Sequence, residues 1–310
     1  MDILPAGGRR KRREDPAAVG APGTEEAPGV PSTRRAARTA GKAGRNLPVA
    51  AGVGVGLGAL VLVSLFTRKE LFVALVAVAI ALAVWELSTA FAARRLRVPL
   101  VPVLVGSVGI LVSAFASGPE ALLVAFGLTV LALVVWRVMD GVDGAARDVA
   151  AGVFSATYVP FLAGFAMLML AEPDGPRRIV VFILLVVASD VGGYAVGVLA
   201  GKHPMAPSVS PKKSWEGLGG SVAACLVAGV LSVVLLLDGP WWAGLLVGAT
   251  AVLTATAGDL AESLLKRDLG IKDMGSLLPG HGGVMDRLDS LLPTAPVVYL
   301  LLAAFVPVAG

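Results

Sequence analysis

Residues 71–85 read Leu71-Phe-Val-Ala-Leu-Val-Ala-Val-Ala-Ile-Ala-Leu-Ala-Val-Trp85, an uninterrupted apolar run within the segment 70–91. A helix of about 20 apolar residues is long enough to cross a hydrocarbon core of about 30 Å. Such runs recur along the chain, which has 310 residues, 56% of them hydrophobic and 15% charged. Because the runs are continuous rather than alternating, they argue against a transmembrane β-barrel. The sequence therefore predicts an all-α protein, a polytopic transmembrane helical bundle.

The apolar runs predict about nine spans, separated by short turns on one side of the membrane and longer polar connections on the other. The expected spans are residues 48–66, 70–91, 98–117, 119–138, 149–170, 178–200, 216–237, 241–260 and 288–308.

The basic residues predict the orientation of these spans. Residues 1–46 are rich in Pro, Gly, Ala and Arg, and we expect a disordered basic cytoplasmic tail, followed by a transmembrane catalytic domain over 47–310. With the tail in the cytoplasm, 22 of the 26 Lys and Arg residues lie on that side, as the positive-inside rule requires. The N-terminus is then cytoplasmic and the C-terminus outside, and the long polar connections 201–215 and 261–287 both face the cytoplasm.

One charged stretch, residues 259–290, stands out from the apolar chain. Ionisable groups are costly near a bilayer, so their concentration indicates a functional site. Asp259, Glu262, Ser263 and Lys266 have the spacing i, i+3, i+4, i+7, which places them on one face of a helix. The single cysteine of the chain, Cys225, lies in an apolar run, and a cysteine-based metal site is therefore excluded.

The same stretch combines metal-binding and phosphate-binding residue types. Asp286 and Asp289 are three residues apart, and a Gly-rich loop, residues 279–283, precedes them. Such a loop brings backbone N–H groups close to a ligand. Carboxylates and phosphates are the ligands that Mg²⁺ prefers. The stretch therefore predicts a site for a nucleotide or another diphosphate; the alternative is a charged loop whose salt bridges only hold two spans together.

The spacing of this stretch resembles the signature of the phosphatidate cytidylyltransferase, or CDP-diacylglycerol synthase, family. The resemblance is strongest over residues 150–308. The residues that carry it are Ser263-x-x-Lys266-Arg267-x-x-x-x-Lys272-Asp273-x-Gly275-x-x-Leu278-Pro279-x-His281-Gly282-Gly283-Val284-x-Asp286-Arg287-Leu288-Asp289, with Ser210-Pro-Lys212-Lys213-Ser214-Trp215-Glu216-Gly217 and the segment 188–197 in support.

The resemblance implies an enzyme that makes CDP-diacylglycerol and pyrophosphate from CTP and phosphatidic acid, for phospholipid biosynthesis in the bacterial plasma membrane. It implies Mg²⁺, with room for a second, different cation, no nucleic-acid partner, and a homodimer. The metal ligands would be Asp259 and Asp286, with Asp190 as a third candidate. The expected catalytic residues are Lys266, Arg267, His281 and Asp289, and the expected substrate-binding residues are Lys212, Lys213, Ser214, Ser263, Lys272, Gly282, Gly283 and Arg287.

Two features leave alternatives open. Asp190 shares a helix face with Gly193 and Gly197, which also suits an acid that pairs with a closely packed helix. The segment 140–147 is similar to part of the motif of membrane phosphotransferases that act on CDP-activated lipids, but its spacing is wrong and the paired aspartates that should follow are missing. A transporter is a further alternative, disfavoured because the chain has no internal repeat.

Overall fold

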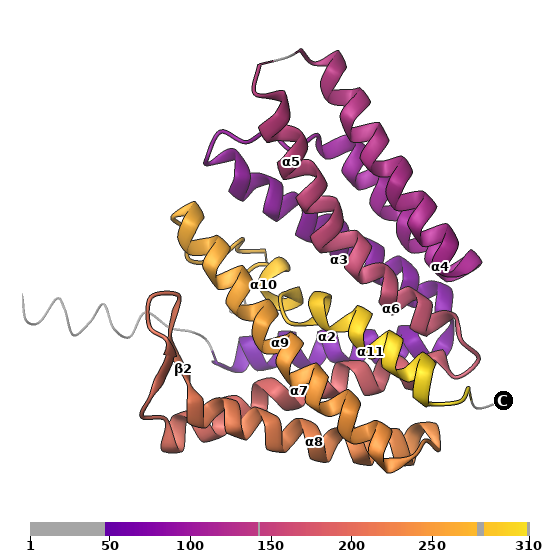
Figure 1. Ribbon diagram of the computed structural model, residues 1–310, viewed down its shortest axis with the longest axis vertical. Coiled ribbons are helices and arrows are strands. Elements are labelled where there is room, and N and C mark those ends of the chain that lie inside the picture. Colours follow the sequence, from indigo (N-terminus) through magenta and orange to yellow (C-terminus); the bar gives the residue numbers. More distant parts are fainter. Residues whose placement is uncertain (1–46, 142, 278–281, 309–310) are drawn as a thin grey trace, which may run out of the picture. The chain divides into compact units, whose positions relative to one another are not determined.

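The computed structural model describes residues 47–141, 143–277 and 282–308. The tail predicted for residues 1–46 lies outside the described residues, and so does His281. The described chain consists of helices and one small β-hairpin (Figure 1). The elements are α2 (Leu47–Thr67), α3 (Lys69–Ala92), α4 (Leu100–Met139), α5 (Ala145–Ala156), the π-helix η2 (Thr157–Phe161), α6 (Leu162–Ala171), α7 (Gly175–Ala200), β1 (Pro204–Ala206), β2 (Ser210–Ser214), α8 (Trp215–Leu237), α9 (Trp241–Leu269), α10 (Met285–Leu288) and α11 (Leu291–Phe305).

Seven helical segments in the described part of the chain are long and apolar enough to cross a membrane. They are Lys69–Ala92, Leu100–Met139, Ala145–Ala171, Gly175–Ala200, Trp215–Leu237, Trp241–Leu269 and Met285–Phe305. The prediction of a helical membrane protein is thereby confirmed in its coarse form. Many large apolar side chains on these helices remain exposed, as expected of surfaces that face lipid.

The 40-residue α4 doubles back on itself. Gly118 has φ 83° and ψ −166°, which is not helical, and Pro119 follows it. A Cβ atom added to Gly106 would overlap the side chain of Thr129. Those two residues would be about 35 Å apart along a straight helix, at 1.5 Å per residue. The turn at Gly118 therefore separates two antiparallel halves, which correspond to the expected spans 98–117 and 119–138.

Helices α7, α8 and α9 pack through their glycines. A Cβ atom on Gly192 would lie 2.6 Å from the backbone oxygen of Gly220, which joins α7 to α8. Gly229 on α8 meets the backbone of Gly244 on α9 in the same way. Small residues let helix backbones approach closely inside a membrane, where van der Waals packing drives helix association. Gly193 and Gly197, the glycines of α7 that were expected to allow close packing, likewise lie against Gly217 of α8.

In the part of the chain that the structure describes, the connection 201–215 departs from the expected all-α fold. Within the connection 201–215, β1 and β2 form an antiparallel two-stranded sheet that pairs Pro204 with Ser214. The expected span 241–260 is also longer, because α9 continues to Leu269. Gly270, with φ 74°, then ends the helix in a left-handed conformation, and the N–H of Ile271 donates to the carbonyl of Lys266.

Buried ion pairs fix the helix ends. Arg178 at the start of α7 binds Asp174 at 2.6 Å and the carbonyl of Val306, and so ties the end of α11 to α7. Elsewhere, Arg137 binds Asp148 at 3.0 Å. The Arg137 guanidinium also donates to the carbonyls of Gly141, at 2.8 Å, and Asp143, which lie in the segment 140–147 that is similar to the motif of other phosphotransferases, so that segment has a structural role between α4 and α5.

Candidate active site

Two cavities open beside α9 and share Asp190 and Asp259. We call the first the acid cavity; it has a volume of about 340 Å³. It is lined by Val186, Asp190, Asp259, Lys266, Asp273, Asp286, Arg287, Asp289 and Ser290. The second, the hairpin cavity, has a similar volume and lies against β2. Of the predicted site residues, it is lined by Asp190, Lys212, Lys213, Ser214 and Asp259.

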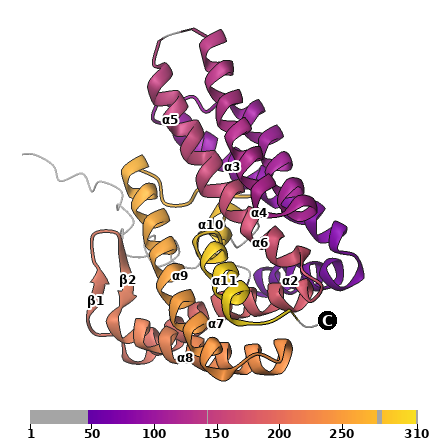
Figure 2. The same cartoon turned by 45° about the vertical axis from the view of Figure 1, so that its right-hand side comes forward.

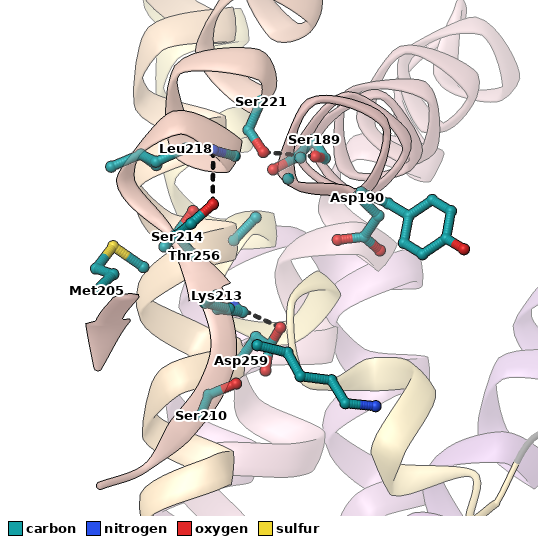
Figure 3. A pocket seen from close by; sticks show the side chains of 16 residues that line it. Ser189, Asp190, Met205, Ser210, Lys213, Ser214, Leu218, Ser221, Thr256 and Asp259 are labelled. Carbon is teal, nitrogen blue, oxygen red and sulfur yellow. Dashed lines mark hydrogen bonds and ion pairs between the residues drawn. The ribbon is translucent and has the colours of Figure 1, made fainter. Parts of the chain in front are cut away.

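The hairpin cavity brings together residues from α7, the two strands of the hairpin, α8 and α9 (Figure 3). Lys213 on β2 reaches Asp259 on α9, with 2.5 Å between Nζ and Oδ2. Asp190 on α7 lies across the cavity from them. The Ser214 hydroxyl accepts the N–H of Gly217 at 3.1 Å, so it caps the start of α8. The cavity therefore has cationic side chains on the hairpin and carboxylates on the helices.

Lys266 lines the acid cavity and contacts two carboxylates. Its Nζ lies 2.8 Å from Oδ1 of Asp286 and 3.4 Å from Oε1 of Glu262. The Glu262 side chain is 0% exposed, and neither of its carboxylate oxygens has a hydrogen-bond partner among the described residues. Its own face of α9 carries Asp259 and Ser263, whose hydroxyl donates to Asp259 at 3.3 Å. The prediction that Asp259, Glu262, Ser263 and Lys266 share one face of a helix is thereby confirmed.

Asp286 is held from three directions. Its Oδ1 accepts from Lys266, and its Oδ2 accepts the backbone N–H groups of Met274 and Gly283, each at 3.0 Å. Gly282 has φ 88°, a conformation that favours glycine. The Gly-rich segment therefore presents its backbone to the carboxylate, and the described part of the loop folds around Asp286.

Five of the predicted residues that the structure describes lie outside the linings of both cavities: Ser263, Arg267, Lys272, Gly282 and Gly283. Arg267 is exposed, and its Nε lies 3.4 Å from the carbonyl of Val209 between the two strands of the hairpin. Lys272 is exposed on the segment after α9. Ser263 contacts the site through its hydrogen bond to Asp259. The contacts of Lys213 with Asp259 and of Arg267 with Val209 show that the connections 201–215 and 261–287 meet at the same end of α9.

The acid cavity has the composition of a cation site. Five aspartates line it, against two cationic side chains, Lys266 and Arg287. Crowded carboxylates repel one another unless cations compensate them. Within the described residues, no three His, Cys, Asp or Glu side chains converge closely enough to hold a metal ion. Asp259 and Asp286 are instead each paired with a lysine, Lys213 and Lys266.

Three acidic residues at or beside this site were not among the predicted site residues. Asp273 lines the acid cavity, and Glu262 lies buried beside Lys266. Glu86, on α3, accepts the N–H of Met285 at 2.8 Å. The spacing of Glu262 from Asp259 and Lys266 already placed it on the charged face of the helix. No local sequence pattern connects Glu86 to Met285, 199 positions away.

Comparison with known proteins agrees with this arrangement. The chain matches the cytidylyltransferase family over residues 49–305. It is 41% identical over 306 residues to the phosphatidate cytidylyltransferase of Mycobacterium leprae, an alignment that covers 92% of this chain and 96% of that one. It is 40% identical over 295 residues to the same enzyme of Mycobacterium tuberculosis, covering 89% and 88%. A Brucella suis phosphatidate cytidylyltransferase is 39% identical over 150 residues, 47% of this chain and 56% of its own. The chain belongs to the cytidylyltransferase family.

Proposed function

We propose that this protein is a phosphatidate cytidylyltransferase, which transfers the CMP moiety of CTP to phosphatidic acid and forms CDP-diacylglycerol and pyrophosphate. The relatives that match almost the whole chain carry that name. The observation in the structure that carries the proposal is the junction of the acid cavity and the hairpin cavity at Asp190 and Asp259. Two anionic reactants that must meet need adjoining sites of this kind, with cationic side chains in each.

The reaction requires an oxygen of the lipid phosphate to attack the α-phosphorus of CTP while pyrophosphate departs. Phosphoryl-type transfer depends mainly on positioning and on neutralising charge. Lys266 and Arg287, which line the acid cavity, and Lys212 and Lys213, which line the hairpin cavity, would bind phosphate oxygens. The amide groups that orient Asp286 also hold Lys266 in position, because Asp286 binds both.

We also propose that the site binds Mg²⁺. Oxygen ligands from carboxylates suit this hard cation, and the five aspartates of the acid cavity supply them. Asp259 and Asp286 would hold the ion, with Asp190 as a third ligand, and the carboxylates in excess leave room for a second, different cation. When bound, the ion supplies positive charge to the attacking and leaving phosphate oxygens.

The proposed topology has nine spans. The two halves of α4 would each cross the membrane, and α2 would add a further span to those found by length and composition. The positive-inside rule then places the N-terminus and both cavities on the cytoplasmic side and the C-terminus outside. The apolar helices and the bacterial relatives support a plasma-membrane location. We further propose a homodimer, on the family resemblance alone.

Purified protein in detergent or vesicles tests the activity. With phosphatidic acid, CTP and Mg²⁺ it should release pyrophosphate and form CDP-diacylglycerol, and EDTA should stop both. Restoring Mg²⁺ should restore the reaction. A folded protein that stays inert under these conditions contradicts the proposed function.

A further inference from the structure

Glu86 is a buried acid that contacts the site from another part of the chain. It lies on α3 and is 1% exposed. Its Oε2 accepts the N–H of Met285, the first residue of α10, at 2.8 Å. Its Oε1 has no hydrogen-bond partner among the described residues. Figures 1 and 2 both show α10 between α3 and α9, so this contact joins α3 to the segment that carries Asp286.

The Glu86 carboxylate fits between two glycines of the segment that joins α9 to α10. A Cβ atom on Gly283 would lie 2.6 Å from Glu86 Oε2, and one on Gly275 would overlap Oε1. That same Cβ atom on Gly283 would lie 2.8 Å from the backbone nitrogen of Gly275, so the two glycines also lie close together. The carboxylate therefore needs a backbone without side chains at both positions.

The two backbone segments that enclose Glu86 are also the ones that orient Asp286. Met274, next to Gly275, and Gly283 itself donate their N–H groups to Oδ2 of Asp286. The other oxygen of Asp286 binds Lys266. A change in the spacing of the two segments would therefore move Asp286 and Lys266 together.

We propose that Glu86 is a positioning residue, which acts through Gly275 and Gly283 to hold Asp286 and Lys266 in their reactive arrangement. The proposal rests on the proposed function of the acid cavity. Glu86 does not line that cavity, so it acts without touching the substrates. A buried carboxylate is costly unless it accepts hydrogen bonds, and an apolar side chain would fill the same space at lower cost. The hydrogen bond that the Glu86 carboxylate accepts from the N–H of Met285 explains why a glutamate occupies this position.

The test compares Glu86→Ala, Glu86→Gln and Glu86→Asp in the full-length protein. Glu86→Ala should lower kcat about 100-fold with the KM for CTP within about threefold of the wild-type value. Glu86→Gln keeps an acceptor oxygen at the same reach and should recover activity to within about tenfold of wild type, whereas the shorter Glu86→Asp should not. The matched control is Glu70→Ala, which removes an exposed acid from the same helix and should leave kcat unchanged.

Hydrogen exchange supplies a readout that does not depend on activity. In Glu86→Ala, the amides of Met274, Gly283 and Met285 should exchange faster than in wild type, while those of α7 and α8 should not. A wild-type protein that makes no CDP-diacylglycerol would refute the proposed function but leave this measurement intact.

A double-mutant cycle covers the case in which Glu86→Ala does not fold. Gly275→Ala should displace the Glu86 carboxylate and lower kcat. Glu86→Gln should then lower the kcat of Gly275→Ala by a smaller factor than it lowers the kcat of the wild-type protein. Unchanged kcat in both Glu86→Ala and Gly275→Ala would overturn the proposal. So would a fall in kcat without faster exchange of the three amides, or a Glu86→Gln variant no more active than Glu86→Ala.

Discussion

At the scale of single residues, the account depends on how a few carboxylates and lysines are paired. Lys213–Asp259 and Lys266–Asp286 each join two separate elements. Each pair leaves a cation and an anion at the edge of a cavity where phosphates are proposed to bind. The Lys213–Asp259 pair is partly exposed and contributes little to stability, whereas the Lys266–Asp286 pair is largely buried and forms at a cost in desolvation. Their arrangement is therefore better explained by ligand binding than by folding.

The two aspartates proposed as metal ligands give the first prediction. Asp259→Ala and Asp286→Ala should each lower kcat about 1000-fold, because loss of a preorganised charge at the reacting phosphate costs two to three orders of magnitude. Asp268→Ala is the control, since Asp268 is exposed on α9, the helix that carries Asp259, and lines neither cavity. Thermal unfolding in detergent should be close to wild type for Asp259→Ala and Asp268→Ala and lower for Asp286→Ala, which leaves the largely buried Lys266 without its partner at 2.8 Å. Activity retained by either cavity variant would remove that residue from the metal site.

The hairpin lysine gives a second prediction. Lys213→Gln should raise the KM for one of the two anionic substrates about tenfold, which corresponds to about 1.4 kcal/mol of binding free energy. Measuring KM separately for CTP and for phosphatidic acid identifies the phosphate that Lys213 binds. Lys202→Gln, on the same connection but outside both cavities, should change neither value. Equal KM values for Lys213→Gln and wild type would exclude Lys213 from substrate binding.

At the scale of elements, close helix packing positions the site. The α8–α9 pair is held at Gly229 and Gly244, and α9 carries Asp259 and Lys266. Gly229→Ala should lower the free energy of unfolding by about 1–3 kcal/mol, because the added methyl overlaps the α9 backbone. Gly219→Ala, on the same helix with nothing within 4 Å, should leave it unchanged or slightly raised. Equal melting temperatures for the two variants would contradict the packing.

Much of this element structure follows from local sequence, and some does not. Apolar length predicted the helices, the break at Gly118-Pro119 was expected between two spans, and helical spacing grouped Asp259 with Lys266. The β-hairpin was missed because two strands of three and five residues leave no clear alternation in a polar connection. The contact of Glu86 with Met285 was missed because tertiary contacts between distant helices have no local signature.

At the scale of the whole molecule, the proposed topology requires the hairpin and the turn of α4 to lie on opposite sides of the membrane. Cys225 is the chain's one cysteine, so Cys225→Ser provides a background for labelling. In that background, Ser117→Cys should react with a membrane-impermeant maleimide on intact cells. Ser208→Cys, in the hairpin turn, should react only after the cells are permeabilised. The reverse pattern would invert the topology and place the site outside.

The central claim is that the junction of the two cavities transfers CMP to a lipid phosphate. Position-specific labelling of CTP tests it most directly, in purified protein with phosphatidic acid and Mg²⁺. Label at the α-phosphorus should appear in the lipid, and label at the γ-phosphorus should appear in pyrophosphate; Asp286→Ala should abolish both. Transfer of the γ-label to lipid, or loss of both labels to water without a labelled lipid, would contradict the account.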